Sequence, residues 1–369
     1  MKLRKQKVDG ASLTINGAKI PFSLFKTDYA GQNFVPLQEP WGYAEFHLKN
    51  TLTVSRAKVA VAYLEQARSF YQTARNANRD AAPLLWYYCF LNLAKTYLAQ
   101  TEPVNSLARA VHGIGDLADN ANGYMTLNRQ RITASGAPRN PNRFEIFPQL
   151  CAKLGRPLPP RENKIPIRTI LRQVLGIHRA YMKAFKEESH FLKLREPEFL
   201  EFRAPPANGA LWLRLYLRRE DFSKKTVTFA ELKKKLRPEL TAVTPEAHGE
   251  SIACHCFESE HHPFARYASD ALLPLRAQLR RKIRTLILPR GYLYYVMHER
   301  ERVLPQAAAI YAVMFYLGSI VRYRPYDFDK LIEKKFRWVI DEFIQIAPKQ
   351  FVILMINEIT QSEISYFEN

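Results

Sequence analysis

The pattern of apolar positions changes period along this chain. Val59, Ala67 and Phe70 lie on one face at helical spacing, and a polar turn follows at 76–80. The next segment, 84–98, is apolar or aromatic almost all round, which is typical of a helix buried on most of its surface. The two segments predict a helical hairpin.

The period changes from 3.6 to 2 at residues 210–218. Leucines at 211, 213, 215 and 217 alternate there with large or charged residues, a pattern that indicates a strand. We therefore expect residues 200–265 to form a β-containing insertion. Helical spacing returns at about residue 272.

Together these patterns predict a mainly α protein, with a helical core, a small N-terminal β arm and the β-containing insertion. Short alternations between glycines and prolines predict the arm. The expected domains are an arm at 1–50, a helical domain at 51–199 with a basic loop at 120–160, the insertion at 200–265, and a C-terminal helical domain at 266–369 that packs on 51–199.

Charge narrows the class of partner. The chain has 55 Lys and Arg against 35 Asp and Glu, a formal charge of +20, which attracts polyanions. Nucleic acid is therefore the first expected partner, with a protein partner or homo-oligomer beside it. The apolar stretch at 307–321 is shorter than the roughly 20 residues that span a bilayer, and the N-terminus has no secretory pattern. We expect a cytoplasmic protein without membrane contact.

Two segments carry side chains suited to nucleic acid. One face of the strand at 210–218 combines aromatic rings, which stack on bases, with arginines, which neutralise phosphates. A basic helix follows it along the chain. The alternative is that the strand is covered on both faces and its aromatic residues form a second core. The candidate residues are Trp212, Arg214, Tyr216, Arg218, Arg276, Arg280, Arg281 and Arg284.

Cysteines and histidines gather in one short stretch, which is what a structural zinc site requires. The candidate ligands are Cys254, Cys256, His261 and His262. Their spacing differs from the usual Cys-x-x-Cys and His-x-x-x-His arrangements, so the alternative is a polar loop that binds no metal. No other cofactor is expected, because the chain has no Walker loop, Gly-x-Gly-x-x-Gly or kinase signature.

The spacing of Arg172 and His178 resembles the motif of metal-independent ribonucleases in the higher eukaryotes and prokaryotes nucleotide-binding (HEPN) domains. The resemblance implies that His178 acts as general base on a ribose 2′-hydroxyl while Arg172 stabilises the charge on the phosphate. A chain with many arginines and nine histidines also produces such a spacing by chance.

Two further segments carry a second resemblance. The first runs through 67–71 and 83–95 to the His-Gly pair at 112–113, and the second is 315–325. Together they resemble the YaaC-like family of bacterial proteins, which implies a mostly helical cytosolic protein and no settled activity. The polar residues of these motifs are expected to meet in a structural lock or a pocket for an anionic group. They are Asn92, Lys95, His112, Arg322, Tyr323 and Arg324.

Three functions follow as hypotheses. The first is a bacterial nucleic-acid-binding protein that is a subunit of a multiprotein system such as antiviral defence, by analogy with helical hairpins in such systems. The second is a HEPN-like ribonuclease. The third is a non-enzymatic scaffold for protein interactions. The sequence leaves open whether the protein is an enzyme.

Overall fold

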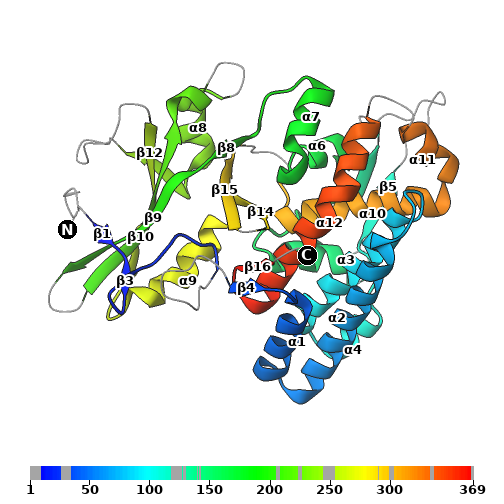
Figure 1. Cartoon of the computed structure of the whole chain (residues 1–369), viewed down its shortest axis with the longest axis horizontal. Coiled ribbons are helices and arrows are strands. Elements are labelled where there is room, and N and C mark those ends of the chain that lie inside the picture. The colour runs from blue at the N-terminus through cyan, green and yellow to red at the C-terminus, as the bar shows by residue number, and fades with distance from the viewer. Residues whose placement is uncertain are drawn as a thin grey trace. The chain divides into compact units, whose positions relative to one another are not determined.

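A computed structural model describes residues 10–25, 35–117, 127, 130–138, 140, 143–204, 208–222, 227–243, 254–289, 291–298, 303–332 and 336–366 (Figure 1). The chain divides into two compact units. Unit 1 comprises Met1–Val35 and Phe191–Glu299, and unit 2 comprises Pro36–His190 and Arg300–Asn369. Each unit is therefore assembled from two separate stretches of sequence.

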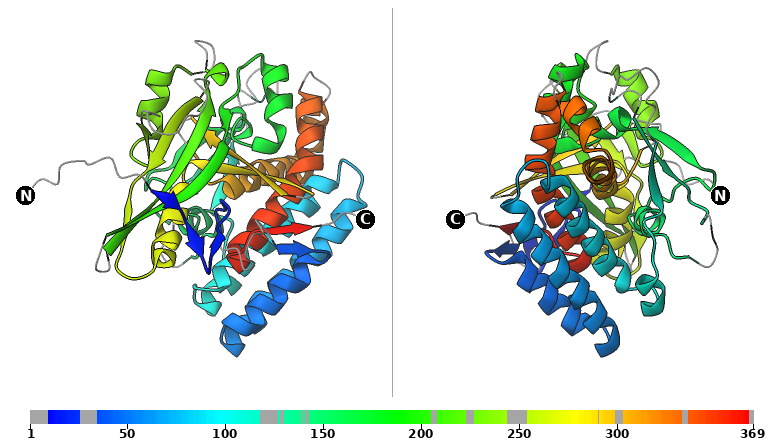
Figure 2. Two further views of the ribbon diagram at one scale, coloured as in Figure 1. Left: turned by 60° about the vertical axis from the view of Figure 1, so that its left-hand side comes forward. Right: turned by 90° about the vertical axis from the view of Figure 1, so that its right-hand side faces the viewer.

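Unit 2 contains the helices that carry the sequence motifs. The helical hairpin consists of α2 (Val54–Arg75) and α3 (Ala82–Ala99), which pack along each other (Figure 1 and Figure 2). The other helices are α1 (Pro40–Thr51), α4 (Val104–Ala108), α5 (Ile146–Lys153), α6 (Ile167–Leu171), α7 (His178–Phe185), α10 (Gln306–Tyr323), α11 (Pro325–Ile332) and α12 (Arg337–Thr360).

Strands complete unit 2. A three-stranded sheet has the order β5 (Ile114–Leu117), β6 (Arg131–Ala134) and β7 (Asn163–Pro166), all antiparallel. A short strand, β16 (Ile364–Tyr366), follows α12, and β4 (Val35–Leu37) includes the point in the sequence where the first stretch of unit 1 ends and unit 2 begins.

The core of unit 2 is formed by α3, α10 and α12, each buried around most of its surface. The rings of Phe90 and Phe351 stack with centroids 3.9 Å apart. Gly318 allows α10 to approach α3 closely, since a Cβ there would lie 3.2 Å from the carbonyl oxygen of Pro83 and from Cβ of Tyr87. The hairpin predicted from periodicity is therefore held by a third and a fourth helix.

Unit 1 is built around a sheet with the order β1 (Ala11–Ser12), β9 (Arg195–Ala204), β10 (Asn208–Arg218), β12 (Cys254–Ser259) and β11 (Leu240–Val243); β13 (His262–Phe264) also pairs with β10. A second sheet has the order β14 (Ile283–Leu288), β15 (Gly291–Met297) and β8 (Phe191–Lys193). A hairpin of β2 (Thr14–Ile15) and β3 (Ala18–Lys19) and the helices α8 (Phe229–Leu236) and α9 (Ala268–Leu279) complete the unit. The leucine face of β10 lies in one apolar core with Leu232 and Leu275 from the two helices.

The mainly α fold class predicted from the sequence is wrong. About 50% of the described residues are helical and 24% are in strands, in several sheets, so the protein is mixed α/β. Residues 283–297 show the reason: they were expected to continue a helical domain, but they form the β14–β15 hairpin. Five of the six residues of β14 are buried or half-buried without alternation, and such a run has no period of 2 to distinguish it from a buried helix.

The prediction of a basic loop at 120–160 is wrong for the residues of this range that the structure describes. The range contains β6 and α5, and Phe147 and Leu150 of α5 are fully buried. Arg129 and Arg139, which contributed to the prediction of a basic loop, lie outside the described residues. Within the described parts of the chain, no helix combines the length and the apolar character needed to cross a membrane.

Candidate anion-binding site

Three elements of unit 2 carry basic side chains that are related through neighbouring tyrosines and through their electrostatic effect on His112. Lys95 lies seven residues after Tyr88 on α3, about two helical turns, and therefore on the same face. Its Nζ lies 5.1 Å from the ring centroid of Tyr63 on α2. Arg322, in the last turn of α10, donates from Nη1 to the Tyr88 hydroxyl at 3.0 Å. The loop after α4 supplies the third group, His112.

Backbone contacts hold His112 in place. The N–H of Val111 donates to the carbonyl of Phe144 at 2.8 Å, and the N–H of Phe147 donates to the carbonyl of His112 at 3.0 Å. Gly113 follows with φ +67°, a left-handed conformation that favours glycine. The histidine is therefore fixed against the start of α5 by its own and its neighbours' backbone.

The side chain of His112 has a defined partner. The hydroxyl of Tyr87 lies 2.5 Å from Nδ1 of His112 and 3.5 Å from the hydroxyl of Tyr311. Burial raises the pKa of Tyr87 far above its ordinary value, so this hydroxyl keeps its proton. We assign it as the donor to Nδ1, because that is the shorter contact. A neutral His112 then carries its proton on Nε2, where it can donate to a ligand.

Charge and burial act together on these groups. Burial, and then the cations of Lys95 and Arg322, lower the pKa of His112 below its usual value. Burial also lowers the pKa of Lys95. Among the described residues, no carboxylate forms an ion pair with any of these three side chains. The cluster of Lys95, His112 and Arg322, the cation cluster hereafter, would thus gain from a bound anion.

The other predicted motif residues have different roles. Arg324 pairs with Asp116 and lies 3.8 Å from Oδ2 of Asp327, so its charge is already compensated. Asn92 is buried, and its Nδ2 donates to the carbonyl of Tyr88 at 2.9 Å, one helical turn back. Tyr323 is 67% exposed, and the guanidinium of Arg322 lies 4.9 Å from its ring centroid. Lys95, His112, Arg322 and Tyr323 thus belong to the candidate site, whereas Asn92 and Arg324 stabilise the structure.

The sequence prediction missed the tyrosines of the site, Tyr63, Tyr87 and Tyr88. Tyr87 and Tyr88 lie within the quoted family motif, and their apolar neighbours indicated only a buried helix. The hydroxyls of Tyr87 and Tyr88 were the signal in the sequence that could have identified them. A buried tyrosine hydroxyl usually has a hydrogen-bond partner, so polar groups are expected near this apolar helix.

The predicted catalytic residues lie close together in sequence: Arg172 follows the end of α6, and His178 is the first residue of α7. Nδ1 of His178 contacts the carbonyl of Leu175. Burial is the main cause that lowers the pKa of His178, and the cation of Arg179 lowers it further. Arg172 lies near enough to Tyr181 of α7 to lower the pKa of its hydroxyl, although burial has the larger and opposite effect. The assignment of Arg172 and His178 as a catalytic pair stays a prediction.

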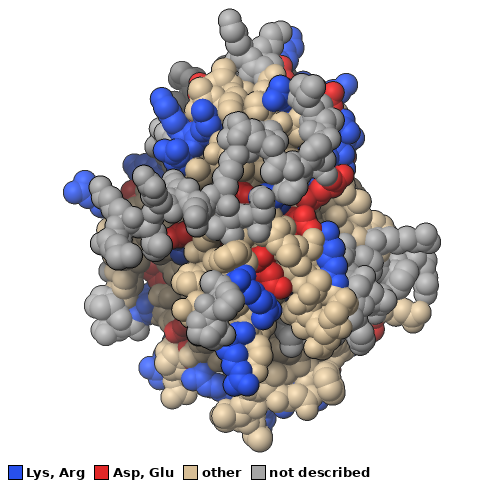
Figure 3. Space-filling view, turned by 90° about the vertical axis from the view of Figure 1, so that its left-hand side faces the viewer, with Lys and Arg blue, Asp and Glu red and all other residues tan. Residues whose placement is uncertain are grey.

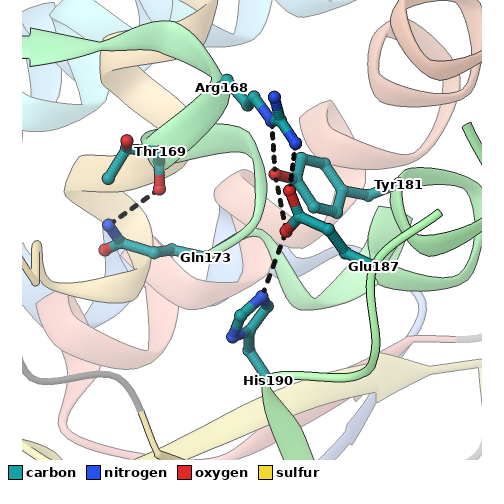
Figure 4. Close-up of polar contacts among 6 residues, drawn as sticks. All are labelled: Arg168, Thr169, Gln173, Tyr181, Glu187 and His190. Atoms are coloured by element: carbon teal, nitrogen blue, oxygen red, sulfur yellow. Dashed lines mark hydrogen bonds and ion pairs between the residues drawn. The ribbon is translucent and has the colours of Figure 1, made fainter. Parts of the chain in front are cut away.

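A polar network lies beside these residues (Figure 4). Glu187 accepts from Arg168, from the Tyr181 hydroxyl at 3.2 Å and from Nε2 of His190 at 3.4 Å. Burial raises the pKa of Tyr181 to about 12, and the hydrogen bond from Arg168 opposes part of this increase. In the same view Gln173 donates to the carbonyl of Thr169 at 3.0 Å, and it also accepts from the N–H of Leu304 at 2.9 Å. These contacts tie α6, α7 and the start of the last helical stretch together.

The predicted stacking face on β10 needs correction. Trp212 is fully buried. The centroids of its ring and of the His261 ring lie 4.3 Å apart, and a Cβ on Gly10 would lie only 2.4 Å from Cη2 of Trp212. Arg214 pairs with Glu258 across the strands at 2.7 Å. Tyr216 is half-buried, and Arg218 is exposed and paired with Glu220. A buried tryptophan cannot stack on a base, so Trp212 is corrected from a stacking ring to a core residue, whereas Tyr216 and Arg218 on the same face are only partly covered or exposed.

The basic helix is also partly internal. Arg276 is buried and donates to the carbonyl and hydroxyl oxygens of Ser23, and Arg280 donates to the carbonyl of Leu24. Arg284 is buried in β14, whereas Arg281 is exposed. On the face drawn in Figure 3, described Lys and Arg side chains lie in separate groups with Asp and Glu between several of them. Among the described side chains on that face, Lys and Arg do not form one continuous stripe.

The predicted zinc ligands have other partners. His261 stacks on Trp212, and Nε2 of His262 lies 2.8 Å from the Gln278 side-chain oxygen. Cys254 is half-buried and Cys256 buried on β12. Within the described ranges, no group of three or more His, Cys, Asp or Glu side chains is arranged to hold a metal ion. The four residues are thus not gathered around one point in unit 1.

Fold and site define a mixed α/β protein of two units, with a cation cluster contributed by α3, the loop after α4 and the end of α10. The chain belongs to the YaaC-like family, whose model matches residues 23–359. The resemblance drawn from two short motifs is therefore confirmed, and the match includes the segment 200–265. No curated protein and no solved structure matches this chain.

Proposed function

We propose that this protein binds nucleic acid in the bacterial cytosol through the cation cluster of unit 2, as a non-enzymatic subunit of a larger assembly such as an antiviral system. The observation that carries the proposal is that, in addition to burial, Lys95 and Arg322 both lie near enough to His112 to lower its pKa, while no described carboxylate forms an ion pair with any of the three side chains. Lys95 and Arg322 are positive and have no carboxylate ion pair among the described residues, and a bound anion compensates for their charge.

The three side chains suit a phosphate group. Arg322 offers a planar fork of donors, Lys95 a compact charge and His112 an Nε2–H donor. Lys95 is half-buried, which strengthens its electrostatic contact with a bound anion relative to a solvated lysine. Phosphate contacts give affinity that does not depend on sequence, as expected for a subunit whose partners supply specificity.

The test is binding of a labelled single-stranded oligonucleotide across a salt series by fluorescence anisotropy. The double variant Lys95→Gln, Arg322→Gln is compared with Lys58→Gln, Lys234→Gln, which removes the same charge from two exposed positions. The site variant should weaken binding about tenfold or more and reduce the slope of log K against log salt by about 1.4, from roughly 0.7 per phosphate contact. The control variant should retain most of the affinity and most of the salt slope of the unmodified protein.

Equal losses in the two variants would overturn the assignment of the site, and no binding by the unmodified protein would overturn nucleic-acid binding in favour of a protein-interaction scaffold. Gels of the same mixtures follow the integrity of the RNA. Cleavage that is lost in both Arg172→Ala and His178→Ala would overturn the non-enzymatic part of the proposal and restore the ribonuclease hypothesis.

A further inference from the structure

Two exposed tyrosines lie where α10 ends and α11 begins. Tyr323 is 67% exposed, although it ends the well-buried helix α10, and Tyr326 in the first turn of α11 is 70% exposed. Exposed aromatic rings of this size are the exception on a protein surface when several occur together. Three residues of chain span at most roughly 11 Å, so both rings are within reach of neighbouring nucleotides of one strand.

Each ring has a cation beside it. The guanidinium of Arg322 lies 4.9 Å from the ring centroid of Tyr323, and Nζ of Lys330 lies 4.2 Å from that of Tyr326. Rings with adjacent cations provide stacking for a base and charge for the phosphate next to it.

The tyrosines continue the cation cluster. Arg322 belongs to both groups, since it contacts the hydroxyl of Tyr88 and the ring of Tyr323. Tyr323 also lies near enough to Tyr87 to raise its pKa, although burial is the larger cause. A ligand whose phosphate contacts Arg322 therefore has an exposed ring directly beside it.

The junction that presents the rings is held in place. The N–H of Arg324 donates to the carbonyl of Ile320 at 2.7 Å, and the N–H groups of Asp327 and Phe328 donate to the carbonyl of Arg324 at 3.0 and 3.1 Å. The side chain of Arg324 pairs with Asp116 on β5, and Phe328 is buried. A ring presented by an ordered turn loses less conformational entropy when a base stacks on it.

We propose that Tyr323 and Tyr326 stack on unpaired bases, so that the ligand of the cation cluster is single-stranded nucleic acid. This inference rests on the proposed function and adds the class of strand. In a duplex the base faces are already stacked on each other and are unavailable to a side chain, whereas a single strand exposes them.

The test compares three labelled probes: a single strand, a duplex of the same sequence, and an abasic single strand with the same number of phosphates. Base stacking on an aromatic side chain is worth about tenfold or more in affinity per base. The unmodified protein should therefore bind the single strand at least about tenfold more tightly than the abasic strand, and more tightly than the duplex at equal salt.

The variant Tyr323→Leu, Tyr326→Leu should bind the single strand and the abasic strand almost equally, with abasic binding unchanged. The matched control is Tyr267→Leu in unit 1, a tyrosine that is 52% exposed with the guanidinium of Arg266 at 5.0 Å. It should keep the preference for bases. Circular dichroism establishes that each variant is folded.

Each failure has its own signature. Equal binding of the single strand and the abasic strand by the unmodified protein would overturn stacking and leave phosphate binding intact. Tighter binding of the duplex would also overturn it. A double-tyrosine variant that keeps the base preference would overturn the assignment to these rings, as expected if they contact a protein instead. No binding of any of the three probes by the unmodified protein would overturn the proposed function itself, and the stacking proposal with it.

Discussion

The hydroxyl of Tyr87 on α3 lies 2.5 Å from Nδ1 of His112, in the loop after α4. The contact joins two parts of the family motif that are 25 residues apart in sequence. It orients the imidazole so that Nε2 is left to donate to a ligand, with Lys95 and Arg322 as its charged neighbours.

Removal of Lys95 should raise the pKa of His112. The cation of Lys95 disfavours the imidazolium form, so Lys95→Met relieves a repulsion and makes His112 easier to protonate. The measurement is an NMR titration of the His112 ring protons, with Lys58→Met on the exposed side of α2 as the control. An unchanged midpoint in Lys95→Met would mean that the two groups do not interact.

Gly113 should tolerate alanine less well than Gly155 does. Both have positive φ, +67° and +83°, so both substitutions carry a backbone cost of about 1 kcal/mol. A Cβ at Gly113 would also lie 2.7 Å from Cβ of Glu145 and Cδ of Pro148, whereas one at Gly155 meets nothing within 4 Å. We expect a further loss of about 1–3 kcal/mol in Gly113→Ala, measured by urea unfolding. Equal losses would contradict this account of the His112 loop.

The charge of Arg324 should stabilise unit 2. Arg324→Gln leaves Asp116 and Asp327 near each other without a cation, at sites that are mostly screened from water. We expect a loss of about 1–3 kcal/mol in the free energy of unfolding, below the cost of breaking a fully buried pair. Arg337→Gln breaks an exposed pair with Asp341 and should cost about 0–1 kcal/mol. The reverse order would show that Arg324 contributes little to folding.

Trp212 should matter for stability and not for nucleic-acid binding. It is fully buried in unit 1, so Trp212→Ala should cost about 3–5 kcal/mol. Trp338→Ala, at a tryptophan that is 50% exposed, should cost less than about 1 kcal/mol. Denaturant unfolding measures both. A mild loss of stability with a strong loss of oligonucleotide affinity in Trp212→Ala would restore the stacking face on β10.

Acid should destabilise unit 2 in part through His178. Burial lowers the pKa of His178 in the folded state below its ordinary value of about 6.5. The folded state then binds fewer protons than the unfolded chain, so this contribution is complete above pH 6.5 and is lost as pH falls through the folded pKa. His178→Gln should flatten the pH dependence of unfolding on the acid side. His261→Gln in unit 1 is the control, and equal slopes in both would contradict the prediction.

Local sequence determined the elements whose apolar pattern is their own. The hairpin of α2 and α3 follows from helical spacing in each segment, and the leucine face of β10 follows from strict alternation. The family motifs likewise identified Lys95, His112 and Arg322 as residues to examine. These are properties of residues a few positions apart, so they can be recognised without a tertiary structure.

Tertiary structure decided which strands exist and which charges are compensated. Trp212 and Tyr216 lie on the same face of β10, so the local pattern does not distinguish them. Trp212 is a core residue because Gly10 and His261, which are distant in sequence, pack against it. Arg322 and Arg324 are two residues apart, but Arg324 meets Asp116 across 208 positions while Arg322 meets Tyr88 across 234. Burial and pairing depend on which distant residues the fold brings near, and that information is absent from the local pattern of either arginine.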